Sequence, residues 1–343
     1  MDIDTARTVI GQFYRHQIPS TSPAIEDLGA AGGFSGANLW RIVDADRVLC
    51  LRRWPRQQVD RQQRLTWIHE VIEQAYHSGC SFLAVPLPNA NDQSLTSHNG
   101  YLWQLEPWMP GLANFRESPS EKKLYGGIQA LAQFHEAMRG KARPSRCSPG
   151  IMMRRERMAE LWQQGAVTER FLQIESGSLA HDAPHGIRPL AQSICDVFRL
   201  LAPAISRQLN WAMGVPVEIQ PVLGDVWHDH LLFNEQGIVS GIVDYGAMRE
   251  DTPASDVARL TGSLVGDDAE QWSRALNAWD EAMPSSVLDR ELCRVLDHAT
   301  TINAAVNWLE WICVEKRDFG ALEPVFGRLQ RLARRMDFLA ASM

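Results

Sequence analysis

The chain contains 343 residues, enough for two domains at about 100–200 residues each. Acidic residues outnumber basic residues by 41 to 34, and the net charge of −7 argues against the basic surface that nucleic-acid binding requires. The sequence shows no uninterrupted apolar run of about 18 residues, so we expect no membrane span. Only four of the 34 basic residues are lysines, and the first of them is Lys122.

The six cysteines stand singly, without a Cys-x-x-Cys pair. This spacing is not typical of a zinc site or of a disulfide framework. The N-terminal residues also lack the order of charged, apolar and small residues that marks a secretory signal. We therefore expect reduced cysteines and a cytoplasmic location.

The first part of the chain combines helical and strand-like patterns. Residues 2–17 have apolar residues at helical spacing, and residues 39–54 read as two strands around an Asp-containing turn, which predicts an antiparallel hairpin. Residues 60–78 predict an amphipathic helix. Two short strands are expected at 82–88 and 101–111, separated by a polar turn.

After residue 111 the pattern becomes mainly helical. The expected helices cover residues 121–140, 151–175 and 187–212 and the region from 254 to the end. Gly140 is a candidate C-cap for the first of them. Residues 219–247 return to short strands, with a turn at 234–237. The order predicts an α+β protein with a strand-rich part at 1–106 and a helix-rich part at 107–343.

The most informative segment is residues 222–246, VLGDVWHDHLLFNEQGIVSGIVDYG. Asp225 precedes the first strand of the hairpin expected here, and Asp244 ends the second. A hairpin with one Asp at each open end brings two carboxylates to the same rim. One carboxylate that accepts a proton and one that holds a hard cation suit Mg²⁺-dependent chemistry on a phosphate.

Three short motifs in this region resemble those of the aminoglycoside phosphotransferase family, which also contains choline-, homoserine- and fructosamine-kinase-like enzymes. They are Gly-Asp at 224–225, Ile-Val-Asp-Tyr-Gly at 242–246 and Asp-Val-Ala at 256–258. The resemblance covers about residues 28–262. It implies a two-lobed protein-kinase-like fold, with a small antiparallel β-sheet N-lobe and a larger, mainly α-helical C-lobe.

Three upstream segments agree with the family in order. Residues 32–40, GGFSGANLW, resemble its glycine-containing phosphate loop. Residues 106–111, EPWMPG, resemble the connector between lobes, and residues 130–138, ALAQFHEAM, a helix that ends near a histidine. The family therefore implies ATP and Mg²⁺ as the nucleotide and metal.

The resemblance implies a role for each matching residue. Asp225 would be the catalytic Asp that accepts or orients the proton of the acceptor, and Asp244 would bind Mg²⁺, with His230 as a second ligand. Asp256 would bond the backbone of the catalytic loop. The implied nucleotide contacts are the backbone of Gly33, Ser35 and Gly36 and the side chain of Arg52 at the phosphates, and the backbone of Glu106 and Trp108 at the adenine.

The sequence departs from the family at several positions. Leu223 replaces the His before Gly-Asp, and His230 replaces a metal-binding Asn with a softer ligand. No lysine precedes residue 122, so Arg52 takes the place of the phosphate-anchoring lysine, although Arg and Lys are not interchangeable at a tight site. The helix acid that normally pairs with that lysine is not identified; Glu70 and Glu73 lie on the expected helix.

Several structural interpretations stay open for these residues. Arg52 can equally be a surface strand residue, and His230 a packed hairpin residue. Asp225 and Asp244 can cap turns. Trp227, inside the catalytic loop, is a candidate wall of the acceptor site.

These observations favour a small-molecule kinase that transfers the γ-phosphoryl group of ATP to a hydroxyl or an amine. One alternative is a pseudokinase-like module that binds a nucleotide or metabolite without turnover. Another is a metal-dependent hydrolase that uses Asp225, His228, Asp229, His230 and Asp244. The acceptor and the oligomeric state are open, since an arginine-lined site suits an acidic metabolite and an acidic site suits a cationic amine.

Overall fold

The computed structural model describes residues 3–13, 23–29, 36–56, 59–162, 186–284, 288–317, 319 and 323–343. The chain forms two compact units. The first contains residues 1–140 and 228–248, and the second contains residues 141–227 and 249–343. The sequence predicted a boundary between two lobes at residues 106 and 107. This boundary is a different division from the two compact units, and it stays a prediction.

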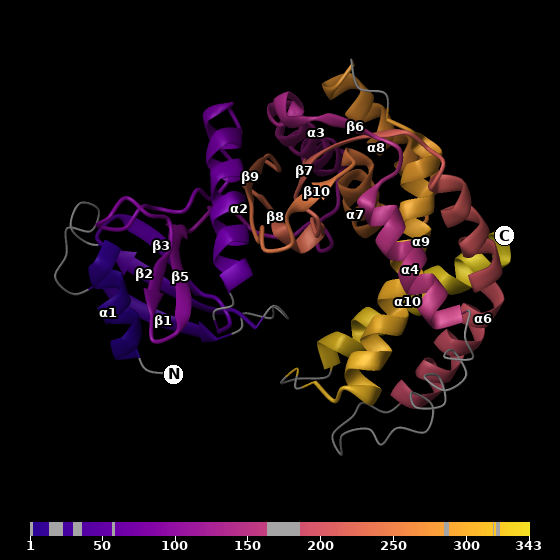
Figure 1. Cartoon of the computed structure of the whole chain (residues 1–343), viewed down its shortest axis with the longest axis horizontal. Helices are drawn as coiled ribbons and strands as arrows, with labels where there is room; N and C mark the ends of the chain where they lie inside the picture. Colours follow the sequence, from indigo (N-terminus) through magenta and orange to yellow (C-terminus); the bar gives the residue numbers. More distant parts are fainter. Residues whose placement is uncertain are drawn as a thin grey trace. The chain divides into compact units, whose positions relative to one another are not determined.

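An antiparallel sheet is the central layer of the first unit (Figure 1). Its five strands have the order β1-β2-β3-β5-β4. They are β1 Ala24–Gly29, β2 Asn38–Asp44, β3 Arg47–Arg53, β4 Thr96–His98 and β5 Tyr101–Pro107. The hairpin predicted at 39–54 is confirmed as β2 and β3, which pair in continuous register from Asn38–Arg53 to Asp44–Arg47.

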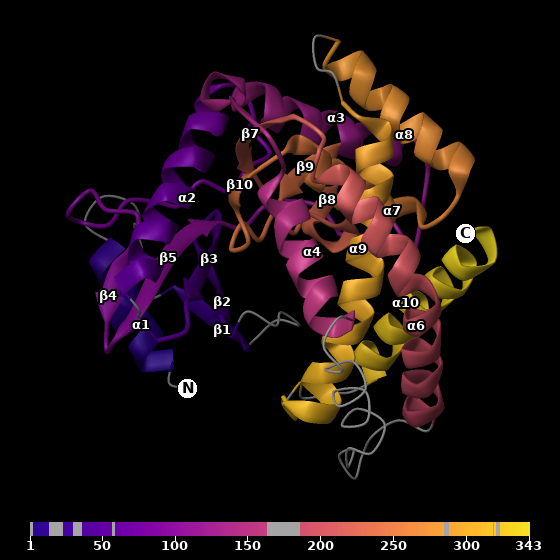
Figure 2. The ribbon, with the colours of Figure 1, turned by 45° about the vertical axis from the view of Figure 1, so that its right-hand side comes forward.

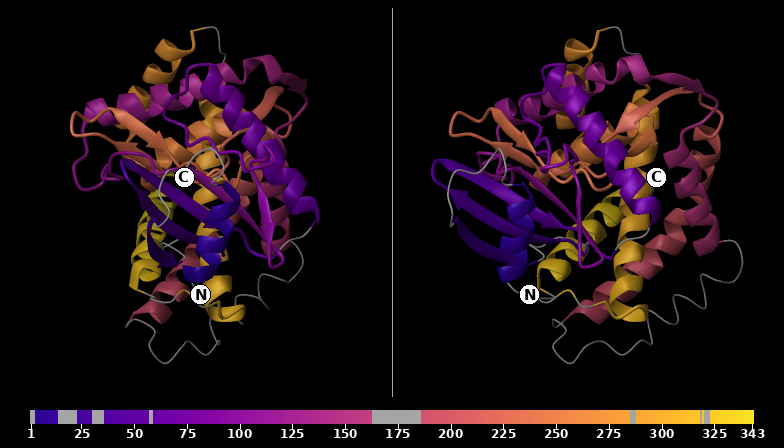
Figure 3. Two further views of the ribbon diagram at one scale, coloured as in Figure 1. Left: turned by 90° about the vertical axis from the view of Figure 1, so that its left-hand side faces the viewer. Right: turned by 60° about the vertical axis from the view of Figure 1, so that its left-hand side comes forward.

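The two faces of this sheet differ because side chains alternate along each strand. One face is apolar and packs against α1 (Ile3–Phe13), which lies across the strands (Figure 3). That core contains Ala6, Val9, Ile10, Phe13, Trp40, Ile42, Leu49, Leu51, Trp103 and Leu105. The opposite face carries the buried polar side chains of Arg52, Gln104 and Glu106. Helix α2 (Val59–His77) supplies a histidine to this polar face.

The remaining elements of the first unit support a second hairpin. Helix α3 (Glu121–Ala137) contacts β9 (Val239–Ile242), which pairs with β8 (Leu231–Phe233). The predicted turn between them is confirmed, because the side chain of Asn234 accepts the N–H group of Ile238 at 2.9 Å. Helix α3 ends at Ala137 and Met138 is its C-cap, so the expectation of a C-cap at Gly140 is wrong.

In the second unit, α9 (Arg290–Leu309) contacts four other helices (Figure 2). The helices around it are α4 Pro149–Trp162, α6 Ile187–Ala212, α7 Pro253–Val265 and α10 Glu323–Ser342, and α8 Ala269–Ala282 contacts α7. The strands β6 Arg143–Ser145, β7 Val217–Val222 and β10 Arg249–Asp251 form a sheet in the order β10-β7-β6. No helix among the described residues is long and apolar enough to cross a membrane.

The α+β architecture and most of the expected helices are confirmed, and α6 begins and ends where the sequence predicts. The strand expected at 82–88 is wrong. Leu83 forms an isolated bridge there, and β5 pairs with β3 on one side and on the other with β4, inside the expected polar turn. Pro86 and Pro88 explain the difference, since proline lacks the N–H group that a strand ladder needs. Residues 163–175 of an expected helix lie outside the described residues.

Candidate active site

Arg52 lies at the centre of the polar face of the sheet, on β3 opposite Gln104 of β5, and is only 8% exposed. Its guanidinium contacts two carboxylates. Nη2 lies 3.4 Å from Oε1 of Glu106, and Nη1 lies 3.6 Å from Oδ1 of Asp244. The guanidinium carbon is also 5.3 Å from the ring centroid of Trp54. The interpretation of Arg52 as a surface residue is therefore wrong.

The two carboxylates keep Arg52 charged. Burial by itself lowers the pKa of the guanidinium, but Glu106 and Asp244 outweigh burial, and the pKa lies above its ordinary value. Burial also raises the pKa of the Glu106 carboxyl, while Arg52 and a hydrogen bond from Gln104 oppose that rise. Each buried charge thus depends on the other for its compensation.

The acid that pairs with Arg52 comes from the neighbouring strand and not from the helix. Sequence reasoning assigned the backbone of Glu106 to adenine and did not identify its side chain as the partner of Arg52. Glu70 and Glu73 are exposed on α2, and Glu73 lies 4.0 Å from His77. The signal was present in β5, where polar side chains at 104 and 106 fall on the same face as Arg52.

Gln104 links Glu106 to α2. Its amide donates to Oε2 of Glu106 at 2.7 Å, and its carbonyl Oε1 accepts Nε1–H of Trp54 at 2.7 Å. Nε2 of His69 lies 3.1 Å from the same Oε1. Because an amide oxygen only accepts, Nε2 of His69 carries the proton, and Nδ1 accepts from the hydroxyl of Ser94 at 2.8 Å. Helix α2 therefore presents a neutral histidine to Gln104, which in turn bonds Glu106, the partner of Arg52.

Asp244 follows β9 in the left-handed backbone region, with a φ of 66°. Few residues other than glycine adopt this conformation, although Asp tolerates it better than most. Tyr245 holds the loop in place: its hydroxyl donates to the carbonyl of Ile242 and accepts the N–H group of Ala84 at 2.8 Å. Such a locally strained carboxylate is a marker of a functional position.

His230 lies beside Asp244, with Nε2 3.8 Å from Oδ2, in the short turn His228–His230. Protein Mg²⁺ sites commonly use one or two carboxylates together with substrate phosphates and water. The half-exposed carboxylate of Asp244 fits this donor set, and the imidazole of His230 is a softer addition. Within the described ranges, no group of three or more His, Cys, Asp or Glu side chains is arranged to hold a metal ion.

The expected nucleotide contacts are only partly described. Gly33 and Ser35 lie outside the described residues. Gly36 has a φ of +73°, and an added Cβ would lie 3.1 Å from Pro55, so the backbone there favours glycine. The N–H group of Trp108 donates to the carbonyl of Val48 at 3.0 Å, so an adenine contact at Trp108 would use its carbonyl oxygen.

Asp225 lies in the loop after β7 of the second unit. The N–H groups of Leu223 and Gly224 donate to the carboxylate of Asp256 at 2.7 and 2.8 Å. Asp256 is completely buried in the first turn of α7. Its predicted role in holding the backbone of this loop is confirmed.

Arg259 is a site residue that sequence reasoning missed. Its Nε and Nη2 lie 2.9 and 2.8 Å from Oδ1 of Asp225. Arg259 follows Asp256 by three residues, which places both on one face of α7, and this spacing was the available signal. The structure thus groups Arg52, Glu106, Asp244 and His230 in the first unit. Asp225 and Arg259 lie in the second unit; the shared rim expected for the two Asp residues stays a prediction.

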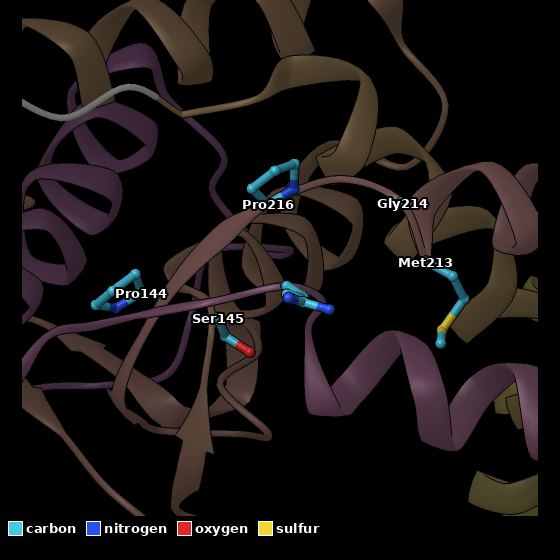
Figure 4. Close-up of a pocket in the computed structure, with 6 residues that line it drawn as sticks. Pro144, Ser145, Met213, Gly214 and Pro216 are labelled. Atoms are coloured by element: carbon cyan, nitrogen blue, oxygen red, sulfur yellow. The ribbon is translucent and has the colours of Figure 1, made fainter.

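The described residues form a hollow in each unit. A narrow one in the first unit is lined by Arg52, Trp54, Leu65, Ile68, His69, Gln104, Glu106, Asp244, Tyr245 and Gly246. A wider one of about 540 Å³ lies in the second unit between the end of β6 and the loop that follows α6 (Figure 4). Its lining is mainly apolar and contains none of the predicted site residues.

Comparison with known proteins identifies the family. The model of the phosphotransferase enzyme family matches residues 28–289. The chain belongs to this family. Comparison with curated proteins gives no match.

Solved structures share the fold at low identity. A spectinomycin phosphotransferase in complex with ADP and spectinomycin has a TM-score of 0.63 and 11% identity over 93% of each chain. An aminoglycoside phosphotransferase from Alicyclobacillus acidocaldarius has a TM-score of 0.63 and 14% identity over 98% of this chain and 94% of its own. A microcompartment-associated aminopropanol kinase has a TM-score of 0.60 and 13% identity over 99% and 97%. These likenesses confirm the kinase-like fold.

The neutral state of His69 makes the stability of the protein depend on pH. Burial lowers the pKa of His69 from 6.5 to about 4, so the unfolded state binds more protons between these values. The free energy of unfolding therefore falls as the pH drops from about 6.5 to 4. In His69→Gln, we expect the free energy of unfolding to fall by about 3 kcal/mol less than in the wild type over this pH range.

The measurement is denaturant unfolding of both proteins at pH 7 and pH 4. His77→Gln is the matched control, because His77 is an exposed histidine on the same helix. An identical pH dependence in the wild type and in His69→Gln would contradict a neutral buried His69.

The pairing of Arg52 with Glu106 predicts a large effect of a small change. Glu106→Gln keeps the shape of the side chain but leaves the buried Arg52 with Asp244 alone. We expect the free energy of unfolding to fall by about 3 kcal/mol. Glu70→Gln, an exposed substitution on α2, is the control and should change stability by less than about 0.5 kcal/mol. Equal stability of the two variants would show that Glu106 does not compensate Arg52.

Proposed function

We propose that this protein transfers the γ-phosphoryl group of ATP to a hydroxyl or amine of a small molecule. The observation that carries the proposal is the position of Arg52 beside Asp244. A buried, permanently charged guanidinium lies 3.6 Å from the carboxylate of the family's metal-binding motif. A cation and a metal-ligating acid at this spacing suit the polyphosphate of a nucleotide.

The first unit would bind the nucleotide. Arg52 would bind phosphate oxygens through its planar fork of N–H donors, and the backbone of Gly33, Ser35 and Gly36 would surround the phosphates. The backbone of Glu106 and Trp108 would meet the adenine. Lys123 does not take the role of Arg52, because its Nζ already donates to Asn114 Oδ1 at 2.8 Å and to the carbonyl of Ser118 at 2.9 Å.

Asp244, with His230, would hold Mg²⁺. The metal ion, when bound with ATP, neutralises charge on the phosphates. The contact between Asp244 and Arg52 is longer than a hydrogen bond, so the carboxylate can keep this partner while it binds another cation. The left-handed backbone at Asp244 fixes the direction of the side chain before a ligand arrives.

Asp225 would take or orient the proton of the acceptor. Both contacts with Arg259 reach Oδ1, which leaves Oδ2 available to the acceptor. The side chain of Asp225 is half exposed, and Asp256 holds its loop through two backbone N–H groups. The chain would therefore supply a positioned base, and most of the rate enhancement would come from positioning and electrostatics.

The second candidate is a pseudokinase-like module that binds a nucleotide or metabolite. Arg52 and His230 favour it, because both depart from the residues that the family uses. Nucleotide binding without transfer to any acceptor would support the module. We expect the cytoplasm as the location in both cases, since the six cysteines are unpaired.

Asp225→Asn tests the base. We expect kcat to fall by about 10²- to 10⁴-fold, because an amide does not accept the acceptor proton. The Kd for ATP should stay within about twofold, because Asp225 does not hold the nucleotide. Release of ADP and titration calorimetry measure the two quantities. Asp196→Asn, an exposed change on α6, is the control, and full activity of Asp225→Asn would overturn the assignment.

Asp244→Asn tests the metal site. In the wild type, Mg²⁺ should lower the Kd for ATP. We expect this effect of Mg²⁺ on the Kd to be about 10- to 100-fold smaller in the variant. The Kd for ATP is measured with Mg²⁺ and with a chelator. Asp92→Asn is a matched control, since Asp92 also has a positive φ, of 58°, and is exposed in the first unit. Equal dependence on Mg²⁺ in both variants would remove Asp244 from the metal site.

A further inference from the structure

One tryptophan of the first unit contacts both the phosphate-binding arginine and the loop of the metal site. Trp54 directly follows β3 and is buried. Its ring centroid lies 5.3 Å from the guanidinium carbon of Arg52, and its Nε1–H group donates to Oε1 of Gln104 at 2.7 Å. The hydrogen bond lies in the plane of the indole and the guanidinium lies over its face, so the two contacts together fix the orientation of the ring.

The benzene edge of the same ring reaches Gly246, the last residue of the Asp-Tyr-Gly motif. A Cβ added at Gly246 would lie 3.0 Å from Cη2 and 3.2 Å from Cζ3 of Trp54. Both distances are shorter than the roughly 3.5–4.0 Å of a favourable carbon–carbon contact. Gly246 does not have a positive φ. The ring of Trp54, and not the backbone conformation, therefore limits this position to glycine.

The same side of Gly246 faces the carboxylate of Asp244. The added Cβ would lie 3.6 Å from Oδ1 of Asp244, which is the oxygen that faces Arg52. The edge of Trp54 and this oxygen thus approach one point of the loop. Any shift of the backbone at Gly246 toward or away from the ring also moves the residue that carries the carboxylate, because only Tyr245 separates the two.

Helix α2 also holds this loop. Nη2 of Arg64 donates to the carbonyl of Gly246 at 2.8 Å and lies 3.4 Å from the carbonyl of Met248. Arg64 is exposed, so this contact can be removed without opening the core. Trp54, Arg64 and the loop all belong to the first unit.

Asp244 depends on such support, because its own contacts do not fix its carboxylate. Its 3.6 Å contact with Arg52 is longer than a hydrogen bond, and its side chain is half-exposed. Its φ of 66° is a conformation that a residue other than glycine keeps only where the surrounding structure imposes it. The loop contacts on either side of Asp244 therefore determine where its carboxylate lies.

We propose that Trp54 is a positioning residue of the metal site. Packed against Gly246, it holds the carboxylate of Asp244 where Mg²⁺ and the nucleotide phosphates bind together. This inference rests on the proposed function and names a residue that the proposed function does not use. Trp54 supplies no ligand in this role and acts through the loop. A change at its contact with Gly246 should therefore weaken the effect of Mg²⁺ on ATP binding more than ATP binding itself.

The test is a double-mutant cycle on this contact. Gly246→Ala adds the methyl group that meets the ring, and Trp54→Phe removes Cη2 and Cζ3. Titration calorimetry gives the Kd for ATP with Mg²⁺ and with a chelator for the wild type, both single variants and the double variant. We expect Gly246→Ala to make the effect of Mg²⁺ on the Kd about tenfold smaller, because a ligand displaced by a fraction of an ångström binds poorly. Most of that effect should return in the double variant.

Denaturant unfolding of the same four proteins without nucleotide measures the contact itself. Gly246→Ala should lower the unfolding midpoint, because an added group in a filled space destabilises the fold. The loss should be smaller in the Trp54→Phe background, where the space is larger. The controls are Gly126→Ala on α3, where an added Cβ would lie 3.8 Å from Cγ2 of Val239, and Trp211→Phe, an exposed change at the end of α6.

Arg64→Gln tests the loop where the core is untouched. It removes the donor to the carbonyl of Gly246, and we expect the effect of Mg²⁺ on the Kd to be about threefold smaller. Arg64→Lys keeps a charged donor and should retain more of the effect than Arg64→Gln. Arg7→Gln, which changes an exposed arginine of α1, is the matched control. If Trp54→Phe does not fold, Gly246→Ala and Arg64→Gln decide, and an unchanged effect of Mg²⁺ in both overturns the inference.

The failure of this inference and the failure of the proposed function give different results. Equal losses of ATP binding with Mg²⁺ and with a chelator would mean that Trp54 acts on Arg52 or on the fold in general, and would overturn the inference. The same loss from Gly246→Ala with and without Trp54→Phe would also overturn it. Both results leave the proposed function intact, since Mg²⁺ still lowers the Kd of the wild type. If Mg²⁺ does not lower that Kd, the proposed role of Asp244 fails and the inference fails with it.

Discussion

The charge of Arg52 is the constraint on which the first unit depends. A guanidinium in the interior loses most of its hydration, and its burial is tolerated only when carboxylates replace water. Glu106 and Asp244 do so from two different elements, a sheet strand and the loop after β9. The sheet, the second hairpin and helix α2 are therefore tied to one charged group. Gln104 and His69 complete the arrangement by fixing Glu106 and by adding no charge of their own.

A buried arginine and a buried lysine need different arrangements of acids to compensate their charge. A lysine ammonium is a compact point charge, and one acid near its end is enough to compensate it. The fork of Arg52 places its two terminal nitrogens on two acids at once. Because β3 and β5 are adjacent, the diagonal neighbour Glu106 already lies within reach of Nη2. A helix acid is then unnecessary, which agrees with the neutral histidine that α2 presents at this point.

The sequence predicted local structure well where one periodicity dominates. The β2–β3 hairpin follows from alternation, α6 from helical spacing, and the β8–β9 hairpin from the Asn-Glu-Gln-Gly turn at 234–237. It failed at residues 82–88, where Pro86 and Pro88 lack the N–H groups that a continuous ladder needs. Asp256 was placed correctly because its motif specifies a local hydrogen-bonding role.

The partners of the site residues were harder to predict, because they depend on pairing between distant segments. Glu106 reaches Arg52 only through the register of β3 and β5, which no local pattern states. His69 lies on the buried face of α2, and its role depends on a contact with Gln104, which comes from a distant strand. Arg259 lay one turn from Asp256, but its bond to Asp225 requires the loop and α7 to fold together.

Three arginines of this chain show how exposure of the carboxylate separates structure from function. Arg335 bridges Asp267 and Asp297, whose side chains are 12% and 4% exposed, and such a closed group only holds α10 to its neighbours. Arg52 bridges one buried acid and one, Asp244, that is 35% exposed, so one side of the pair can meet a ligand. Arg259 has an acid partner that is 50% exposed. Burial closes the first group to ligands, whereas solvent reaches the carboxylates of Asp244 and Asp225, so a ligand can approach these two acids while their arginines hold them in place.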